Sequence, residues 1–280
     1  MREVNLAKSA GFCFGVKRAV DMVYQSVEQG DSSVCTLGPI IHNEQVVQDL
    51  EKKGVQVISS PKDADKDSTV VIRSHGINKK EENELKSTGC QIIDATCPFV
   101  KKIHNTVHKY SMEGRKIVVV GDPKHPEVQG IVGWSVNGAT VIESLDEAEK
   151  LSFEQEEKLC IVAQTTYNYK KFEDLVVIIR KKGYDIIAVN TICNATEVRQ
   201  KEASELASCS DAMIVIGGRN SSNSQKLYEI CKNLCASTFF IQTVEDLSLE
   251  KLSSFQSLGI TAGASTPNTI IQEVLLACRK

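Results

Sequence analysis

Residues 92–98 read Ile-Ile-Asp-Ala-Thr-Cys-Pro, a short apolar run that ends at Cys97. A helical pattern follows at once, because apolar residues recur at spacings of three and four: Val100, Ile103, Val107 and Tyr110. Pro98 falls in the first turn of that helix, where a missing N–H costs no hydrogen bond. The segment therefore predicts a β-strand, a cysteine at its carboxyl end and an amphipathic helix.

The same arrangement occurs twice more in the chain. Cys13 lies in Gly11-Phe12-Cys13-Phe14-Gly15 and opens a helical pattern, and Cys193 follows the apolar run Ile186-Ile187-Ala188-Val189. After the three cysteines, the next strand-like run ends in a glycine at offsets of 25, 24 and 24 residues: Gly38, Gly121 and Gly217. Such regular spacing predicts three copies of one structural unit.

Each copy also carries polar residues where its strands end. Four residues after the glycines stand His42, His125 and Ser221, and two further on stand Glu44, Glu127 and Asn223. A later apolar strand of each copy ends in a second polar cluster: Ser74-His75-Gly76, Gln164-Thr165-Thr166 and Ala264-Ser265-Thr266. Strands that alternate with helices predict parallel α/β sheets, and ligands bind such sheets beyond the carboxyl ends of the strands.

We therefore expect an α/β fold of three domains related by a pseudo-threefold axis around a central pocket. The expected repeats are residues 14–97, 98–193 and 194–280. Because the third copy reaches the chain end before its last strand, residues 1–13 are expected to complete it. This arrangement would bring the three cysteines and the polar loops together at one point.

Composition and charge narrow the classes of function. The chain has 280 residues, a net charge of −3 and a pI of about 6.0, and it contains no block of like charges. A nucleic-acid partner is therefore not expected. The longest aliphatic stretch, residues 175–179, is far too short to span a bilayer, so we expect a cytoplasmic protein without a membrane partner.

Ten cysteines in a cytoplasmic chain are not expected to form a disulfide framework. The three that head the repeats could bind a zinc ion or a [4Fe-4S] cluster with one iron left open. The cluster is favoured, since a closely spaced histidine or carboxylate ligand for zinc is missing and a cluster accepts ligands from three separate units. The others are expected to pack as small apolar residues: Cys35, Cys90, Cys160, Cys209, Cys231, Cys235 and Cys278.

The polar loops offer many hydrogen-bond donors and few fixed charges, which suits a bound phosphate. These donors are His42, His75, His125, Thr165, Ser221, Asn223 and Ser265. Two further histidines, His104 and His108, are spaced i, i+4 on the helix after Cys97 and are expected on a solvated helix face.

Glu127 is the exception among these donors. A carboxylate beside a phosphate repels it unless the carboxylate is protonated, and a protonated glutamate in a desolvated pocket can serve as a general acid. The alternative is a carboxylate at a helix N-terminus that interacts only with the helix dipole. Glu44, the counterpart in the first copy, keeps that alternative open.

Nine motifs in order along the whole chain resemble the LytB/IspH family, the 4-hydroxy-3-methylbut-2-enyl diphosphate reductases of the non-mevalonate isoprenoid pathway. They are residues 11–16 (GFCFGV), 38–43 (GPIIHN), 73–76 (RSHG), 94–98 (DATCP), 125–127 (HPE), 164–166 (QTT), 191–196 (TICNAT), 220–224 (NSSNS) and 262–265 (AGAS). Phe14 departs from the alanine of the family pattern, beside a cysteine that is kept.

The resemblance implies a trefoil of three α/β domains around a [4Fe-4S] cluster held by Cys13, Cys97 and Cys193. It implies reductive dehydroxylation of the allylic diphosphate to isopentenyl and dimethylallyl diphosphate, with the substrate hydroxyl on the open iron. Glu127 would supply protons, aided by Thr165 near the hydroxyl. The residues implied to hold the diphosphate are His42, His75, Ser221, Ser222, Asn223 and Ser265, with His125 alongside.

Reduced ferredoxin or flavodoxin is the implied electron donor. Two other functions remain open at this point. Another three-cysteine dehydrating enzyme with a cluster, similar to quinolinate synthase, would keep the cysteines but would not need the histidine-rich phosphate site. A non-catalytic iron–sulfur redox sensor would not need Glu127 in the pocket.

Overall fold

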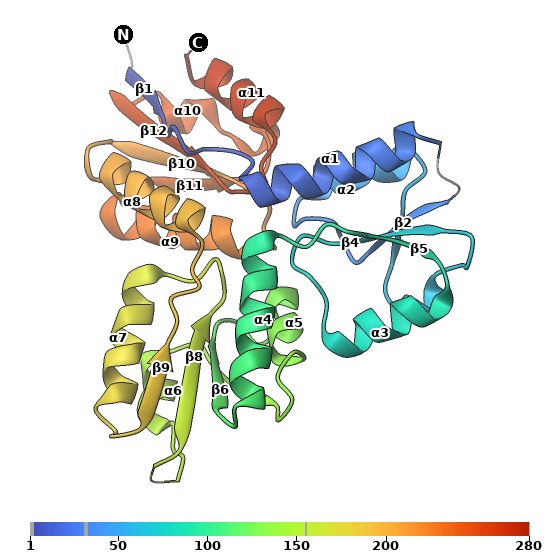
Figure 1. The fold of residues 1–280 in the computed structure, drawn as a ribbon. Helices are drawn as coiled ribbons and strands as arrows, with labels where there is room; N and C mark the ends of the chain where they lie inside the picture. The colour runs from blue at the N-terminus through green and yellow to red at the C-terminus, as the bar shows by residue number, and fades with distance from the viewer. Residues whose placement is uncertain (1–2, 31–32, 155, 280) are drawn as a thin grey trace. The chain divides into compact units, whose positions relative to one another are not determined.

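The computed structural model describes residues 3–30, 33–154 and 156–279. It contains three four-stranded parallel sheets (Figure 1). The first sheet has the order β3-β2-β4-β5, with strands at Gln56–Ile58, Val34–Leu37, Thr69–Ile72 and Gln91–Asp94. Its helices are α1 (Phe14–Glu28), α2 (Glu44–Lys52), a 3-10 turn (Pro61–Asp63) and α3 (Lys79–Thr88).

The second sheet repeats this topology with the order β7-β6-β8-β9. Its strands are Ala139–Ile142, Lys116–Val120, Lys158–Ala163 and Asp185–Ala188. Its helices are α4 (Pro98–Met112), α5 (Pro126–Val132), α6 (Leu145–Lys150) and α7 (Tyr169–Arg180).

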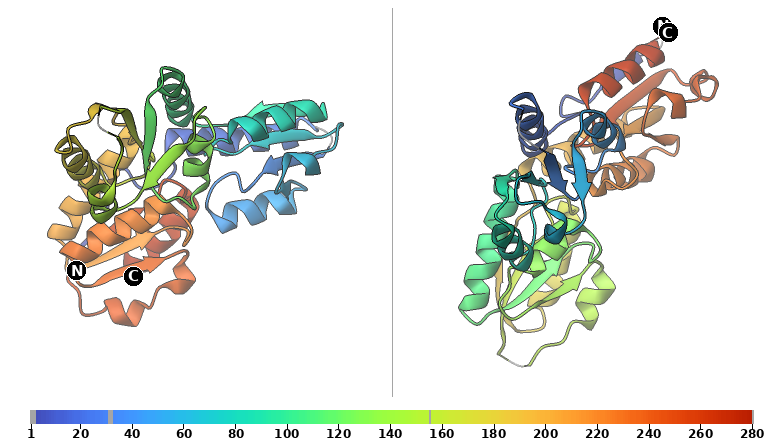
Figure 2. Two further views of the ribbon diagram at one scale, coloured as in Figure 1. Left: turned by 90° about the horizontal axis from the view of Figure 1, so that it is seen from below. Right: turned by 90° about the vertical axis from the view of Figure 1, so that its right-hand side faces the viewer.

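In the third sheet the order is β11-β10-β12-β1, which is the same topology with the chain's first strand in the fourth place. Its strands are Thr238–Ile241, Ala212–Ile216, Ser257–Ala262 and Glu3–Leu6. The helices are α8 (Asn194–Ser208), α9 (Ser222–Leu234), a 3-10 turn (Val244–Asp246), α10 (Leu249–Leu252) and α11 (Asn268–Arg279). Strand β1 lies beside β12 and contacts α11, the last helix (Figure 2). The expected fold class, three α/β units of one kind, is confirmed.

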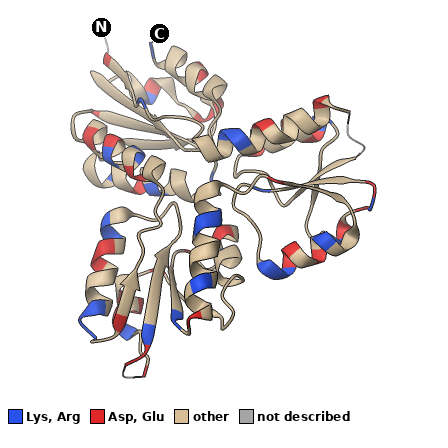
Figure 3. Ribbon diagram, viewed as in Figure 1, with Lys and Arg blue, Asp and Glu red and all other residues tan. Residues whose placement is uncertain are grey.

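The second and third sheets have a hydrophobic core on both faces, which explains the continuous apolar runs of their central strands. In β6, Val118 and Val120 pack with α7 on one face, whereas Ile117 and Val119 pack with α4 and α5 on the other. Strand β10 alternates in the same way between two clusters. Charged residues are left to the outer helix surfaces, where basic and acidic side chains mix along α3 (Figure 3).

The three glycines that mark the repeat occupy one structural position. Strands β2, β6 and β10 each end one residue before the glycine. The N–H of each glycine donates to the last residue of the neighbouring edge strand, at 2.8 Å for Gly38 and 2.9 Å for Gly121 and Gly217. A side chain at Gly217 is excluded, since a Cβ there would lie 2.2 Å from Ser224 Oγ. The regular offsets of the sequence therefore reflect equivalent strand ends.

The chain divides into two compact units. One contains residues 1–17, 42–48 and 194–280 with the third sheet, and the other contains residues 18–41 and 49–193 with the first and second sheets. The boundaries of the three sequence repeats stay a prediction. No helix in the described ranges has both the length and the apolar character needed to cross a bilayer.

Candidate functional site

The three repeat cysteines are built into the fold in the same way. Each lies between the last strand of a sheet and a helix, directly before α1, α4 or α8. Each backbone N–H donates to a carbonyl in the polar cluster after the neighbouring strand: Cys13 to Ala264 at 3.2 Å, Cys97 to Ser74 at 2.9 Å, and Cys193 to Thr165 at 3.0 Å. All three are partly exposed. The repeat predicted from the sequence therefore extends to the hydrogen bonds of the cysteines.

This position suits a metal-binding thiolate. The N-terminus of a helix favours negative charge, and the thiolate is the form of cysteine that binds a metal. Cys97 is the N-cap of α4, and its side chain makes no capping bond. The donor set and its partial exposure fit an iron–sulfur cluster or a zinc ion equally well in chemical terms.

Most of the remaining cysteines lie in the apolar core, as expected. Burial raises the pKa of Cys160 to about 11 and that of Cys231 to about 12, so both stay protonated thiols at neutral pH. Cys209 corrects the expectation, because it is exposed at the end of α8. Its Sγ–H donates to the Leu206 carbonyl at 3.4 Å, at a helix end that faces solvent.

Glu127 is deeply buried, with 1% of its surface exposed. It lies in the first turn of α5, and Thr165 at the end of β8 holds both of its carboxyl oxygens. The Thr165 N–H donates to Oε1 at 2.6 Å and the Thr165 hydroxyl donates to Oε2 at 2.7 Å. Burial raises the pKa of Glu127, and the two bonds from Thr165 oppose that rise without cancelling it.

His125 caps the helix that carries Glu127. Its Nδ1 accepts a hydrogen bond from the Glu127 N–H at 3.1 Å. A ring nitrogen that accepts a bond carries no proton, so the proton of the neutral ring is on Nε2. The His125 ring also contacts His75 edge to face, with ring centres 5.3 Å apart. The structure thus brings together four of the predicted residues in this unit: His75, His125, Glu127 and Thr165.

The other compact unit brings together the serines and His42. Ser221 caps α9, and its Oγ lies 3.0 Å from Ser224 Oγ and 3.5 Å from Ser265 Oγ. The Ser265 hydroxyl also donates to the His42 carbonyl at 3.2 Å. Ser222 begins α9 and is half-buried. These contacts place Ser221, Ser265 and His42 at one end of the third sheet, as the sequence predicts.

Asn223 carries an orphaned donor at the same end of the sheet. The residue is 5% exposed, and its Nδ2 has no hydrogen-bond partner among the described residues. A buried amide donor without a partner costs free energy, which a bound acceptor would recover. This unsatisfied group fits an anionic ligand.

Glu44, the counterpart of Glu127, lies in a different environment. It is the first residue of α2 and is exposed. The helix is capped by the preceding Asn43, whose Oδ1 accepts from the Val46 N–H at 3.1 Å. Glu44 therefore fits the interpretation as a helix N-terminal carboxylate, and Glu127 does not.

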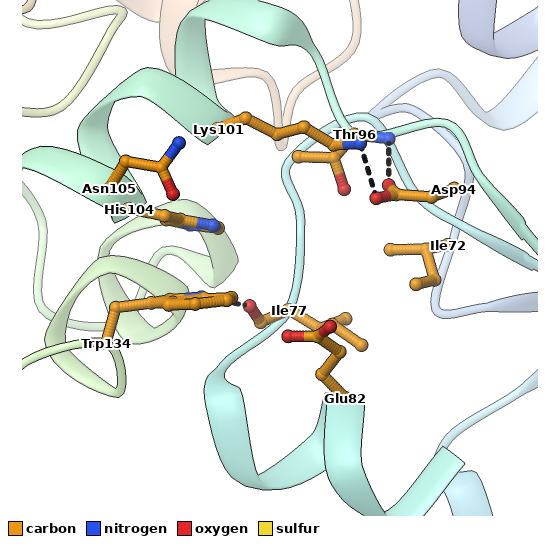
Figure 4. Close-up of a pocket in the computed structure, with 9 residues that line it drawn as sticks. All are labelled: Ile72, Ile77, Glu82, Asp94, Thr96, Lys101, His104, Asn105 and Trp134. Atoms are coloured by element: carbon orange, nitrogen blue, oxygen red, sulfur yellow. Dashed lines mark hydrogen bonds and ion pairs between the residues drawn. The ribbon is translucent and has the colours of Figure 1, made fainter. Parts of the chain in front are cut away.

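A cavity of about 200 Å³ lies beside the Cys97 loop (Figure 4). Asp94, Glu82 and Lys101 line it, but their charges are already paired: Asp94 with Lys101 at 2.5 Å, and Glu82 with Lys79 at 3.0 Å and with Lys86. The cavity contains none of the predicted ligand-binding residues.

His104 also lines this cavity, which corrects the expected solvated position. It is 4% exposed and stacks on Trp134 with ring centres 5.1 Å apart. Burial lowers its pKa to about 4, so the ring is neutral. The face of α4 that carries His104 packs against α5, a tertiary contact that i, i+4 spacing does not indicate.

Sequence reasoning missed the residues that shape the cysteine loops. Asp94 Oδ1 accepts from the Thr96 N–H at 2.9 Å, and Asn190 Oδ1 accepts from the Ile192 N–H at 3.0 Å. Both side chains stand three residues before a cysteine and fold the loop into the same turn. The sequence does contain a signal for this turn, because Asp or Asn stands three residues before the cysteine in two of the three copies.

Phe14 is 67% exposed, so its bulk lies outside the core at the start of α1. The departure from the family pattern at this position therefore leaves the packing around Cys13 undisturbed. The Cys13 N–H keeps the same strand-end bond as the other two cysteines.

Comparison with known proteins agrees with this architecture. The family model described as "LytB protein" matches residues 4–279. A 4-hydroxy-3-methylbut-2-enyl diphosphate reductase of Thermoanaerobacter sp. (strain X514) is 47% identical over 281 residues, covering 99% of this chain and 96% of the relative. The reductase of the same name from Clostridioides difficile (strain 630) is 46% identical, with 97% of both chains covered.

Two solved structures are similar along the chain. One is (E)-4-hydroxy-3-methyl-but-2-enyl diphosphate reductase, the terminal enzyme of the non-mevalonate pathway, at 43% identity and a TM-score of 0.71, covering 100% of this chain and 99% of the other. The second is the corresponding diphosphate reductase of Plasmodium falciparum, at 28% identity and a TM-score of 0.93, covering 98% and 87%. With similarity of this extent, the chain belongs to the LytB family.

Proposed function

We propose that the protein is a 4-hydroxy-3-methylbut-2-enyl diphosphate reductase. It converts its allylic diphosphate to isopentenyl and dimethylallyl diphosphate in the last step of the non-mevalonate isoprenoid pathway. The observation that carries the proposal is the 47% identity, over 99% of the chain, to a reductase of that name. The overall reaction takes up two electrons and two protons and releases the hydroxyl group as water.

Cys13, Cys97 and Cys193 would hold a [4Fe-4S] cluster at the centre of three repeats, residues 14–97, 98–193 and 194–280 with 1–13. The equivalent backbone bonds of the three cysteines and their places at helix N-termini support this ligand set. When bound, the cluster would pass on the two electrons of an external donor, one at a time, and offer an iron with an open coordination position. The seven other cysteines are not needed.

Glu127 would supply the proton that allows the allylic C–O bond to break. Its raised pKa keeps the carboxyl group protonated at a pH where an exposed glutamate is ionised. Oε1 accepts from the Thr165 N–H, so in the protonated carboxyl group the proton would reside on Oε2. The bond between Oε2 and the Thr165 oxygen would then be reversed, with Oε2–H as the donor. The Thr165 hydroxyl is then turned to donate its own proton to the leaving oxygen, which departs as water.

The diphosphate would be held by neutral hydrogen-bond donors. These donors would be His42, His75, Ser221, Ser222, Asn223 and Ser265, with His125 alongside. The unpartnered Nδ2 of Asn223 gains an acceptor when a phosphate oxygen binds. His125 would donate from Nε2, because its Nδ1 is occupied by the cap of α5.

Reduced ferredoxin or flavodoxin would donate the electrons, and the reaction would take place in the cytoplasm. The family resemblance supports the electron donor, and the sequence composition supports the location. An assay with dithionite and a viologen dye replaces the protein donor and so tests the reaction independently of it.

The test is anaerobic purification, iron and sulfide analysis, and measurement of product formation from the allylic diphosphate. We expect four irons per chain and turnover of the substrate. Serine at Cys13, Cys97 or Cys193 should abolish cluster retention, whereas serine at the buried Cys231 or Cys235 should leave the iron content unchanged. A stable cluster without turnover would contradict the reductase and favour a redox sensor.

A further inference from the structure

Two arginines bind the backbone of the loops that lead into repeat cysteines. Arg18 lies in α1, and its guanidinium donates to the Thr96 carbonyl at 3.2 Å and to the Asp94 carbonyl at 3.3 Å. These carbonyls stand one and three residues before Cys97. Arg199 lies in α8 and donates to the Gly11 carbonyl, two residues before Cys13. Each arginine therefore fixes a loop directly before a proposed ligand.

The two arginines lie in the second turn of equivalent helices, at offsets from the preceding cysteine that differ by one residue. Arg18 stands five residues after Cys13, and Arg199 stands six residues after Cys193. In both cases, the arginine lies on the helix that follows one repeat cysteine. Its guanidinium binds the loop that precedes a different repeat cysteine. Arg18 reaches from the helix after Cys13 to the Cys97 loop, and Arg199 reaches from the helix after Cys193 to the Cys13 loop.

A guanidinium is well suited to this role, because it has several fixed donors and keeps its charge at all physiological pH values. Arg199 is 4% exposed and also donates to the Ala195 carbonyl of its own helix at 3.3 Å. Its second contact, Gly11, has a left-handed φ of +102°. A buried cation bound to such a loop holds it in one conformation and places positive charge near an anionic ligand set.

The loop before Cys193 provides an internal comparison. The Thr191 hydroxyl donates to the Ala163 carbonyl at 2.6 Å, and the Ala163 N–H donates to Thr191 Oγ at 2.8 Å. This loop is therefore tied to β8 by a side chain of its own. Changes to Arg18 or Arg199 should leave it in place.

We propose that Arg18 and Arg199 are positioning residues that hold Cys97 and Cys13 in the conformation required to bind the cluster. The inference rests on the proposed function in naming the cluster, but the effect on the loops does not depend on it. Residues that orient metal ligands through hydrogen bonds commonly change metal affinity about 10–100-fold when substituted.

Hydrogen exchange in the metal-free protein tests the loop contacts directly. Arg18→Lys keeps the charge but loses the planar guanidinium that donates to two carbonyls at once. The amides of residues 92–98 should therefore exchange about tenfold faster. Arg199→Lys should have the same effect on residues 9–15. In both variants, exchange of residues 188–194 should stay at the wild-type rate. Unchanged exchange of residues 92–98 in folded Arg18→Lys protein would overturn the proposal.

Arg115→Lys is the matched control. Arg115 also donates to backbone carbonyls, those of Leu159 and Asp185 at 3.2 Å, but these carbonyls lie at the start of β8 and β9, outside the loops that directly precede the repeat cysteines. If Arg199→Lys does not fold, judged by circular dichroism, the half-buried Arg18 carries the test alone.

The holoprotein gives the second readout. Cluster loss to an iron chelator should be about tenfold faster in both variants than in the wild-type protein and the Arg115→Lys control. Equal rates in all four proteins would overturn the role in cluster binding. A wild-type protein that binds no cluster, with the exchange changes present, would instead refute the proposed function and leave the loop contacts established.

Discussion

The starts of α2 and α5 carry the same pattern, a histidine followed two residues later by a glutamate, yet they place the glutamate in opposite environments. Glu127 is buried and bonded to Thr165, whereas Glu44 is exposed. The residue between histidine and glutamate explains the difference. Asn43 caps α2, which therefore begins at Glu44, but Pro126 is suited to the first helical position, so His125 becomes the cap of α5.

A shift of one residue in the cap thus decides which copy keeps a buried acid. In the third copy Ser221 is the cap and Asn223 takes the place of the glutamate. The three copies share a backbone plan but supply different groups: an exposed carboxylate, a buried carboxyl group and a buried amide. Equivalent places in the repeat therefore predict a residue's position in the fold, whereas the cap residue determines the environment of its side chain.

The largest expected effect comes from Glu127→Gln. The substitution keeps the shape of the side chain but removes the acidic proton of the carboxyl group. A positioned general acid contributes about 10²–10⁴-fold to the rate. Turnover of the allylic diphosphate should fall about a hundredfold or more, with cluster content and substrate binding retained. Reduction by dithionite and a viologen dye, followed anaerobically, measures this.

Glu44→Gln is the matched control for that substitution, because it makes the same chemical change at the exposed counterpart. Its turnover should stay within about twofold of the wild-type rate. Near-normal turnover by Glu127→Gln would remove the acid role and make the two glutamates equivalent despite their different burial.

Substitution of Thr165 should have the next largest effect. Thr165 holds both carboxyl oxygens of Glu127, whereas the carboxylate of Glu44 is exposed. Thr165→Val removes the hydroxyl that bonds Oε2 but keeps the backbone bond to Oε1. We expect kcat to fall about 10–100-fold, because one hydrogen bond to a charged or reacting group contributes ~1.5–3 kcal/mol.

Thr165→Ser provides the control for this change, since serine keeps the hydroxyl and loses only a methyl group. Its kcat should lie much closer to the wild-type value than that of the valine variant. Equal losses in the two variants would indicate that packing at Thr165 matters and that its hydroxyl does not.

The sequence predicts the repeat well, because the repeat depends on periodic apolar residues and on strand ends that require glycine. It also predicts the positions of the cysteines, Glu127 and Thr165 relative to those strand ends. It does not separate Glu127 from Glu44, since their burial depends on which residue caps each helix and on how α5 packs against β6. The difference between Asn43 and Pro126 is visible in the sequence. Its effect on the burial of the following glutamate becomes clear only from the cap geometry.

Tertiary contacts account for the remaining differences. His104 is buried because Trp134, thirty residues further along the chain, stacks on its ring. Arg18 and Arg199 bind backbone carbonyls, which have no sequence signature of their own. Such contacts depend on where the backbone passes and are not encoded in local spacing.

The raised pKa of Glu127 predicts a pH-dependent difference in stability. In the unfolded chain the carboxyl group ionises near pH 4.3, and burial raises the pKa in the folded protein. The folded state therefore favours the protonated form, and its stability falls as the pH rises from about 4 through the raised pKa.

Glu127→Gln cannot ionise and does not lose this stability. The variant should unfold a few degrees higher than the wild type at pH 7, since ~1 kcal/mol moves Tm by ~2–4 °C, and the difference should shrink towards pH 4. Calorimetry of the metal-free proteins between pH 4 and 8 measures it. Glu44→Gln should follow the wild-type curve, and a parallel change in both variants would contradict an effect of burial.

The smallest expected effect concerns the cap that separates the two helix starts. Asn43→Ala removes the acceptor for the Val46 N–H, and loss of such a cap costs about 1 kcal/mol of stability. Asn43→Ser should restore most of it, because serine can accept the same bond. Asn78→Ala, which removes the equivalent cap of α3, should cost a similar amount. Urea unfolding of the three variants measures these differences.

The same variant should leave the chemical step unchanged, since Glu44 is already exposed before the cap is weakened. A large fall in kcat for Asn43→Ala would show that the start of α2 takes part in the reaction after all.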